Sequence, residues 1–225
     1  MNCALGAAMA VSAGTFVSCV EANDPTSDMM APHAIVTVKQ NNGNVNLQLD
    51  DVTVLYPLNM QTGTFEKEER AFVNYRMATP ADQARYDAPY GVSNLVYVNW
   101  IEKVLTKSMS ESTQDDDATY GNDPIEVLNS WSTVCEDGYL TLNFRTMYGG
   151  AKTHTVTLVK GEGDYEVVLH HDADGDTGAR VGDGVVAFRL DKLPDTEGDT
   201  VDLKLVYNSF SGTKTVTFKY CTRKD

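Results

Sequence analysis

The sequence predicts an all-β protein in which a small barrel is followed by an antiparallel β-sandwich. From Ala34 onward, apolar and polar residues alternate with the period of two that is typical of half-buried strands. Clusters of Gly, Asn, Asp and Ser separate these runs, as expected for turns. A polar, acidic stretch divides the chain. We therefore expect a barrel domain over residues 33–107, an acidic linker over 108–122 and a sandwich domain over 123–225.

The first domain contains five strand-like runs. They are Val36–Val38, Val45–Leu49, Val52–Leu55, Arg70–Met77 and Leu95–Leu105. The stretch Glu66–Arg76 has helix formers and no breaker, so a short helix is an alternative there. A long irregular connection, Ala78–Ser93, separates the last two strands. Five strands with one such connection favour a small barrel over a sandwich.

The second domain shows clearer alternation, with apolar residues on one face of each predicted strand. These faces are Leu140, Leu142 and Phe144; Val156 and Leu158; Val201, Leu203, Leu205 and Tyr207; and Val216, Phe218 and Tyr220. Glycine-containing turns lie between them, which favours an antiparallel sandwich. We also expect an Asp- and Gly-rich hairpin between Val167–Leu169 and Val185–Leu190.

The first nineteen residues resemble an export signal that ends in a lipid-attachment cysteine. Ala4–Val17 is an apolar stretch without charge, Ser18 is small, and Cys19 is where a bacterial lipoprotein is diacylated and cleaved. We therefore expect a signal peptide over residues 1–18. Two features depart from the usual pattern: no Lys or Arg precedes Ala4, which indicates a start upstream of Met1, and Phe16 stands where Leu is usual.

A buried helix or a membrane anchor is the alternative for this segment, but the run is shorter than the about 20 apolar residues of a span. Residues 19–32 are rich in Asp, Asn, Ser, Thr and Pro, which predicts a flexible tether. Together these features predict attachment to a membrane through a lipid anchor. The location is then the cell envelope, as an outer-membrane lipoprotein on the periplasmic face or the cell surface.

The chain is acidic, with a formal net charge of −14, and 21 of its 32 acidic residues lie in residues 108–225. Nucleic-acid binding depends on Lys and Arg that neutralise phosphates, so we expect no nucleic-acid partner. Two cysteines, Cys135 and Cys221, remain in the folded part. The sequence leaves open whether they form a bridge between edges or stay separate thiols.

The sharpest local pattern is a series of alternate carboxylates at Asp172, Asp174 and Asp176, with Asp183 at position 12. Oxygen ligands at positions 1, 3, 5 and 12 are typical of a Ca²⁺ loop. However, Thr177 stands where that loop needs Gly, Asp183 replaces the usual Glu, and no helix flanks it. A turn rich in Asp and Gly explains the same letters.

No motif for catalysis stands out, and we expect a non-enzymatic protein without a cofactor. His170 and His171 are neighbours on a predicted strand and point to opposite faces, so they cannot readily bind one metal. Gly91-Val92-Ser93-Asn94-Leu95 lacks the second Gly of a nucleophile elbow. Nothing in the sequence selects a glycosidase-like carboxylate pair from 32 acidic residues.

Aromatic residues are the candidates for a binding surface. Barrels of this size can bind oligosaccharides, and aromatic faces in loops suit a sugar ring. The aromatic residues considered are Tyr86, Tyr90, Tyr97, Trp100, Trp131 and Tyr148. Tyr86 and Tyr90, in the long connection, are the preferred ligand-binding residues.

Several stretches resemble the NigD-like proteins of Bacteroides-type bacteria. They are AIVTV, LQLDD, VLTKS, DPIEVLNSW, EDGYLTLNF, THTVTLV and LHHDADGD followed by GVVAFRL. The resemblance runs from about Ala34 to Tyr220, and YLTLNF and THTVTLV are its most distinctive parts. It implies export, a lipid anchor, an N-terminal OB-like barrel and a C-terminal β-sandwich, and it carries over no catalytic residue.

These observations predict a lipid-anchored envelope protein with a binding or assembly role, whose partner is a glycan or an envelope protein. A carboxylate-dependent envelope hydrolase is the alternative. Two facing carboxylates in a pocket of the sandwich would favour the hydrolase.

Overall fold

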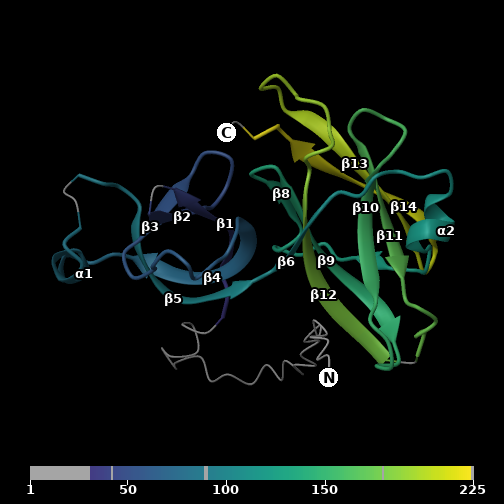
Figure 1. The fold of residues 1–225 in the computed structure, drawn as a ribbon, viewed down its shortest axis with the longest axis horizontal. Coiled ribbons are helices and arrows are strands. Elements are labelled where there is room, and N and C mark those ends of the chain that lie inside the picture. The colour runs from purple at the N-terminus through teal and green to yellow at the C-terminus, as the bar shows by residue number, and fades with distance from the viewer. Residues whose placement is uncertain (1–30, 42, 89–90, 179, 224–225) are drawn as a thin grey trace, which may run out of the picture.

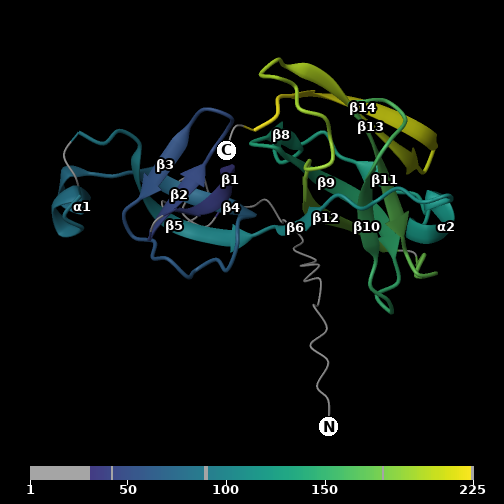
Figure 2. The same ribbon diagram turned by 45° about the horizontal axis from the view of Figure 1, so that its top comes forward.

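The computed structural model describes residues 31–41, 43–88, 91–178 and 180–223. Figure 1 shows two β domains side by side, a barrel from the N-terminal half and a sandwich of two sheets from the C-terminal half. The rotated view in Figure 2 shows the same arrangement. The prediction of an all-β barrel and sandwich is confirmed. In the part of the chain described, no helix is both long and apolar enough to cross a membrane.

The barrel closes on itself in the order β1-β2-β3-β5-β4. Its strands are β1 (Ala34–Asn41), β2 (Asn44–Gln48), β3 (Val54–Pro57), β4 (Glu69–Met77) and β5 (Leu95–Lys103). Alternate residues such as Val36, Leu47 and Val96 are fully buried in its core. The expected alternation therefore directs one face of each strand inward. The alternative helix over Glu66–Arg76 is wrong, because β4 pairs with both β1 and β5.

A short helix, α1 (Pro80–Arg85), lies in the connection that we expected to be irregular. Thr79 caps its first turn: the Thr79 side chain accepts from the Asp82 N–H, and the Asp82 carboxylate accepts from the Thr79 N–H. This reciprocal capping box, with Pro80 at the first helical position, satisfies otherwise unpaired N–H groups. It starts a helix that hydrophobic periodicity does not reveal.

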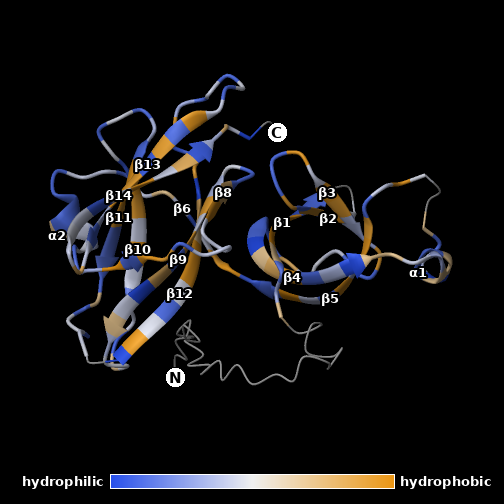
Figure 3. Ribbon diagram, turned by 180° about the vertical axis from the view of Figure 1, so that it is seen from behind, coloured by the Kyte–Doolittle hydropathy of each residue, from blue (hydrophilic) through white to orange (hydrophobic). Residues whose placement is uncertain are grey.

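The sandwich consists of a five-stranded and a four-stranded sheet. The first has β6 (Leu105–Ser108), β12 (Arg180–Arg189), β9 (Tyr139–Tyr148) and β7 (Glu126–Val127) in that order, with β8 (Val134–Glu136) also paired to β9. The second has β10 (Thr155–Lys160), β11 (Glu166–Asp172), β13 (Val201–Ser209) and β14 (Gly212–Tyr220). Figure 3 shows hydrophobic and hydrophilic residues alternating along β13. Between the sheets lies a core that includes Leu142, Leu158, Phe188 and Leu205.

The expected hairpin between Val167–Leu169 and Val185–Leu190 is wrong. β11 pairs with β10 and β13, whereas β12 pairs with β9 and β6 in the other sheet. The Asp- and Gly-rich segment therefore crosses from one sheet to the other. A hairpin and a crossover between sheets use the same turn residues. They differ only in which strands pair with the flanking segments.

The chain passes from barrel to sandwich at the buried Val104, between β5 and β6. The acidic stretch 108–122 lies beyond this point and carries α2 (Asp116–Tyr120), which Asp115 caps by accepting from the Ala118 N–H. The charge pattern alone does not indicate that the chain changes domain at an apolar residue.

Charged side chains hold the two domains together. A single oxygen of Glu68, in the barrel domain, accepts from the Tyr139 hydroxyl at 2.6 Å, from Arg189 at 2.9 Å and from Arg223 at 2.6 Å. We call Glu68, Tyr139, Arg189 and Arg223 the Glu68 cluster. Separately, Lys39 of β1 pairs with Asp137 of the sandwich at 2.8 Å.

The contact between the barrel and the sandwich buries Arg70. It lies on the outward face of β4, yet it is fully buried, because the sandwich covers that face. Its guanidinium donates to Thr37 at 3.0 Å and lies 3.5 Å from the Glu136 carboxylate. Burial lowers the pKa of Arg70, and Glu136 and Asp137 oppose that shift. Alternation in the barrel alone would predict a solvent-exposed Arg here.

Candidate ligand-binding groove

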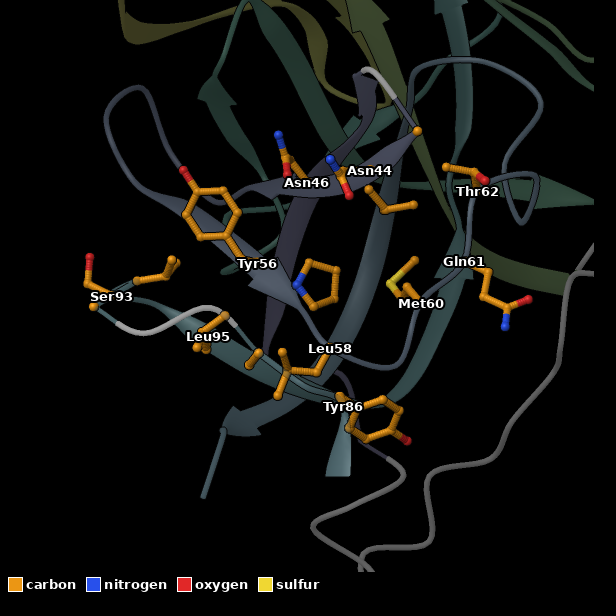
Figure 4. A pocket seen from close by; sticks show the side chains of 16 residues that line it. Asn44, Asn46, Tyr56, Leu58, Met60, Gln61, Thr62, Tyr86, Ser93 and Leu95 are labelled. Carbon is orange, nitrogen blue, oxygen red and sulfur yellow. The ribbon is translucent and has the colours of Figure 1, made fainter. Parts of the chain in front are cut away.

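A groove of about 1030 Å³ opens on the barrel. Three segments line it: the start of β2, the stretch that runs from Tyr56 to Thr62, and the connection between α1 and β5. Figure 4 shows Asn44 and Asn46 on one side of the groove and Leu58 and Tyr86 across from them. The lining thus combines amides with apolar and aromatic side chains.

The polar side of the groove comes from the outward face of β2. Leu47 pairs with Leu55 and points inward, so Asn46 and its neighbour on β3, Tyr56, face outward together. The side chain of Tyr56 is 39% exposed. Strand alternation therefore places an amide and an aromatic ring next to each other on the surface.

The amides of the groove are not used by the fold. Within the described residues, the side chains of Asn44, Asn46 and Gln61 have no hydrogen-bond partner in the protein, and the same holds for the hydroxyls of Thr62 and Ser93. Each amide offers both donors and an acceptor. The groove therefore presents several unpaired polar groups beside apolar and aromatic surface.

Tyr86 is positioned by a chain of contacts that begins in the barrel wall. It is the C-terminal cap residue of α1. Arg76 of β4 donates to both carboxylate oxygens of Asp82, at 2.6 and 3.0 Å, and so fixes α1 against the barrel. These bonds from Arg76 and Thr79 hold the pKa of Asp82 well below its usual range. Arg76 also stacks on Tyr97, whose ring centroid lies 6.3 Å from that of Tyr86.

Only some of the residues predicted for binding lie at the groove. Tyr86 lines the groove, whereas Tyr90 and the lipidation residue Cys19 lie outside the described residues. Tyr97 and Trp100 belong to β5, and Trp131 packs its ring 5.7 Å from Phe72 at the domain boundary. Sequence reasoning missed Tyr56. The signal was present: Leu55 belongs to the inward series, so Tyr56 had to face outward.

The four aspartates considered for Ca²⁺ do not converge. Asp183 makes a two-point salt bridge with Arg145 on the outer face of its sheet, and Asp174 pairs with Lys152. Asp176 accepts from the N–H groups of residues 150–152. Burial opposes the shift, but these bonds hold the pKa of Asp176 below its ordinary value. Across the described ranges, no group of three or more His, Cys, Asp or Glu residues could hold a metal ion.

A second, smaller cavity of about 260 Å³ opens at one end of the sandwich. Phe144, Tyr148, Lys152, His154 and the Gly182–Gly184 segment are among its lining. Behind it, the His154 Nδ1 and His171 Nε2 atoms lie 3.0 Å apart in the buried interior. Burial and the neighbouring His154 lower the pKa of His171.

Cys135 and Cys221 are free thiols, which decides between the two alternatives left open by the sequence. Cys135 packs against the sandwich core, and burial raises the pKa of its thiol to about 12. At neutral pH the thiol is therefore protonated and a poor nucleophile.

The geometry defines a two-domain β protein in which a closed five-stranded barrel carries the groove and a β-sandwich follows. The model of the NigD-like N-terminal OB domain matches residues 35–104, and that of the NigD-like C-terminal beta sandwich domain matches residues 107–220. The chain belongs to the NigD-like family, and the resemblance noted in the sequence is confirmed.

Three solved structures extend this comparison. A protein described as toxin related, from Parabacteroides distasonis, is 32% identical with a TM-score of 0.70, over 84% of this chain and 92% of that chain. A Bacteroides vulgatus protein of unknown function is 21% identical with a TM-score of 0.64, over 83% and 89%. A NigD-like immunity protein from Bacteroides caccae is 20% identical with a TM-score of 0.55, over 84% and 96%.

The last two similarities show the fold alone. None of the three descriptions names an enzymatic activity. No functionally curated protein matches the chain.

Proposed function

We propose that this chain is a non-enzymatic, lipid-anchored binding protein of a Gram-negative cell envelope, and that the barrel groove is its binding site. The observation that carries the binding role is the set of unpaired amides at Asn44, Asn46 and Gln61 beside the exposed ring of Tyr56. Polar groups that converge beside apolar and aromatic side chains in one concavity are a feature of ligand sites.

The anchoring part of the proposal rests on the sequence around Cys19. An apolar stretch, a small residue and a cysteine are followed by a polar tether, as in lipoproteins. Growth with labelled palmitate tests it: the wild-type protein should incorporate label and the Cys19→Ala variant should not. Incorporation into Cys19→Ala would show that the anchor is elsewhere.

The binding part is tested by pull-down from the native envelope with the full chain. The wild-type protein should retain a component that a Tyr56→Ala variant loses, while Val52→Ala retains it. Val52 is a fair control because it is 87% exposed on the same barrel and does not line the groove. Equal capture by all three proteins would place the binding site outside the groove.

The alternative hydrolase finds no comparable support. Of the described residues that line the groove and the smaller cavity, Asp183 is the only acidic one, and its carboxylate is engaged by Arg145. A carboxylate mechanism needs two acidic groups facing each other across a cleft.

A further inference from the structure

The groove on the barrel differs in charge from the rest of the chain. Charged residues make up 22% of the sequence, which would put three or four among sixteen lining residues, yet all sixteen are uncharged. Sites for phosphates, carboxylates or ammonium groups provide charge-assisted hydrogen bonds from Arg, Lys, Asp or Glu. The lining therefore matches an uncharged ligand.

The polar groups of the groove suit hydroxyls. A sugar hydroxyl both donates and accepts, and a side-chain amide can answer in both directions. Asn44 and Asn46 lie two residues apart on one face of β2, about 7 Å apart along the strand at roughly 3.4 Å per residue. They offer a row of such groups instead of a single point of contact.

The aromatic groups suit the apolar face of a sugar ring. Tyr56 contributes a partly exposed ring, and Tyr86 lies on the other side of the groove, with Leu58 and Met60 on the apolar side. Because α1 is capped and tied to β4 through Asp82, Tyr86 is held in place before a ligand arrives, which reduces the entropic cost of binding.

A peptide is the main competing ligand, and the topology disfavours its commonest mode. An extended peptide binds by adding a strand to a free sheet edge. Here β2 pairs with β1 and β3, and β3 pairs with β2 and β5, within a closed barrel. Within the described residues, β2 pairs with β3 only at Leu47 and Gln48, so any free strand edge that faces the groove is confined to the short stretch Asn44–Asn46.

The size of the groove leaves room for more than one sugar ring. Its volume of about 1030 Å³ lies at the upper end of the roughly 300–1000 Å³ of ligand pockets. We propose that the groove binds a chain of several uncharged sugar residues, with Tyr56 and Tyr86 stacking on sugar rings and Asn44 and Asn46 bonding to hydroxyls. This inference rests on the proposed function, in which the groove is the binding site.

Affinity electrophoresis of the full chain tests it. Gels contain a neutral polysaccharide (mannan, xyloglucan, dextran or amylose) or a charged one (polygalacturonate, alginate or heparin). At least one neutral polymer should retard the protein, and no charged polymer should. Tyr56→Ala and Asn46→Ala should each weaken the affinity by at least about fivefold, as expected for central contacts. Val52→Ala should leave it unchanged. Tyr56 and Asn46 lie outside the core, and a circular dichroism spectrum confirms that the variants fold.

Three outcomes overturn the inference: no neutral polymer retards the protein, charged polymers retard it equally, or the groove variants bind as the wild type does. The envelope pull-down separates this failure from that of the proposed function. If the pull-down captures a protein and Tyr56→Ala abolishes that capture, the groove is a binding site but its ligand is not a glycan. If nothing captured depends on Tyr56, both proposals fail.

Discussion

His171 illustrates how a sequence motif acquires a structural role. It is 1% exposed, and its ring meets His154 at 3.0 Å, while its neighbour His170 bonds to the Gly121 carbonyl on the other face of β11. Both rings of the buried pair cannot readily carry a charge at that distance. The pair therefore makes the interior of the sandwich sensitive to acid.

We expect a stability loss on mild acidification from this pair. Burial and His154 lower the pKa of His171 below its usual value near 6.5, so the unfolded chain binds this proton first as pH falls. The contribution is complete above about pH 6.5 and declines as pH falls toward the folded-state pKa, by at most about 1.4 kcal/mol per pH unit for one proton. Urea denaturation between pH 7.5 and 5 measures it.

His171→Gln is the matched variant, since it retains a polar group but does not titrate. Its free energy of unfolding should fall less steeply over the same pH range. Identical slopes for the two proteins would show that His171 is not the responsible group.

At the scale of elements, α1 depends on one carboxylate. Asp82 closes the capping box and accepts both bonds from Arg76, so Asp82→Ala should release the helix from the barrel. Hydrogen exchange of the Gln83 and Tyr86 amides, which bond within this turn, should become several-fold faster. Gln83→Ala, at an exposed position, is the control. Unchanged exchange in Asp82→Ala would mean that packing holds α1 in place.

Strand β12 has a glycine, Gly184, where a side chain would meet the neighbouring strand. A Cβ at Gly184 would lie 2.6 Å from the Phe144 ring of β9, which rests across the strand. Gly184→Ala should therefore cost about 1–3 kcal/mol of unfolding free energy, as overpacked cores do. Combining it with Phe144→Leu should recover part of that loss in chemical denaturation. Additive losses would show that the ring is not what the new methyl group meets.

The sequence predicts elements better than it predicts their partners. The strands that contain Val36 and Leu142 are identified by alternating apolar and polar residues, because a half-buried strand has one face in the core and one in water. It does not say that the segment after Asp172 crosses between sheets, because turn chemistry is the same in a hairpin and a crossover. The aromatic Tyr86 was predicted for the site from its connection, but the amides of the groove were not, since isolated Asn residues carry no pattern.

For the whole molecule, the contact between domains explains residues that neither domain explains alone. Arg70 faces out of the barrel and is buried by the sandwich, and Glu68 accepts three bonds from sandwich side chains. Burial would raise the pKa of Glu68, but the bonds from Arg223 and Tyr139 outweigh it and lower the pKa. The charged form is therefore the one that the interface stabilises.

This cluster should make the domains unfold as one unit. We expect a single calorimetric transition for the wild-type protein, because losing the barrel would leave Arg189, Arg223 and the Tyr139 hydroxyl without their shared acceptor. Glu68→Ala should cost about 2 kcal/mol and separate the barrel and sandwich transitions. Glu66→Ala removes an exposed carboxylate two residues away and should leave one transition. Two transitions in the wild type, or one in Glu68→Ala at unchanged temperature, would mean that the domains are coupled by something other than this carboxylate.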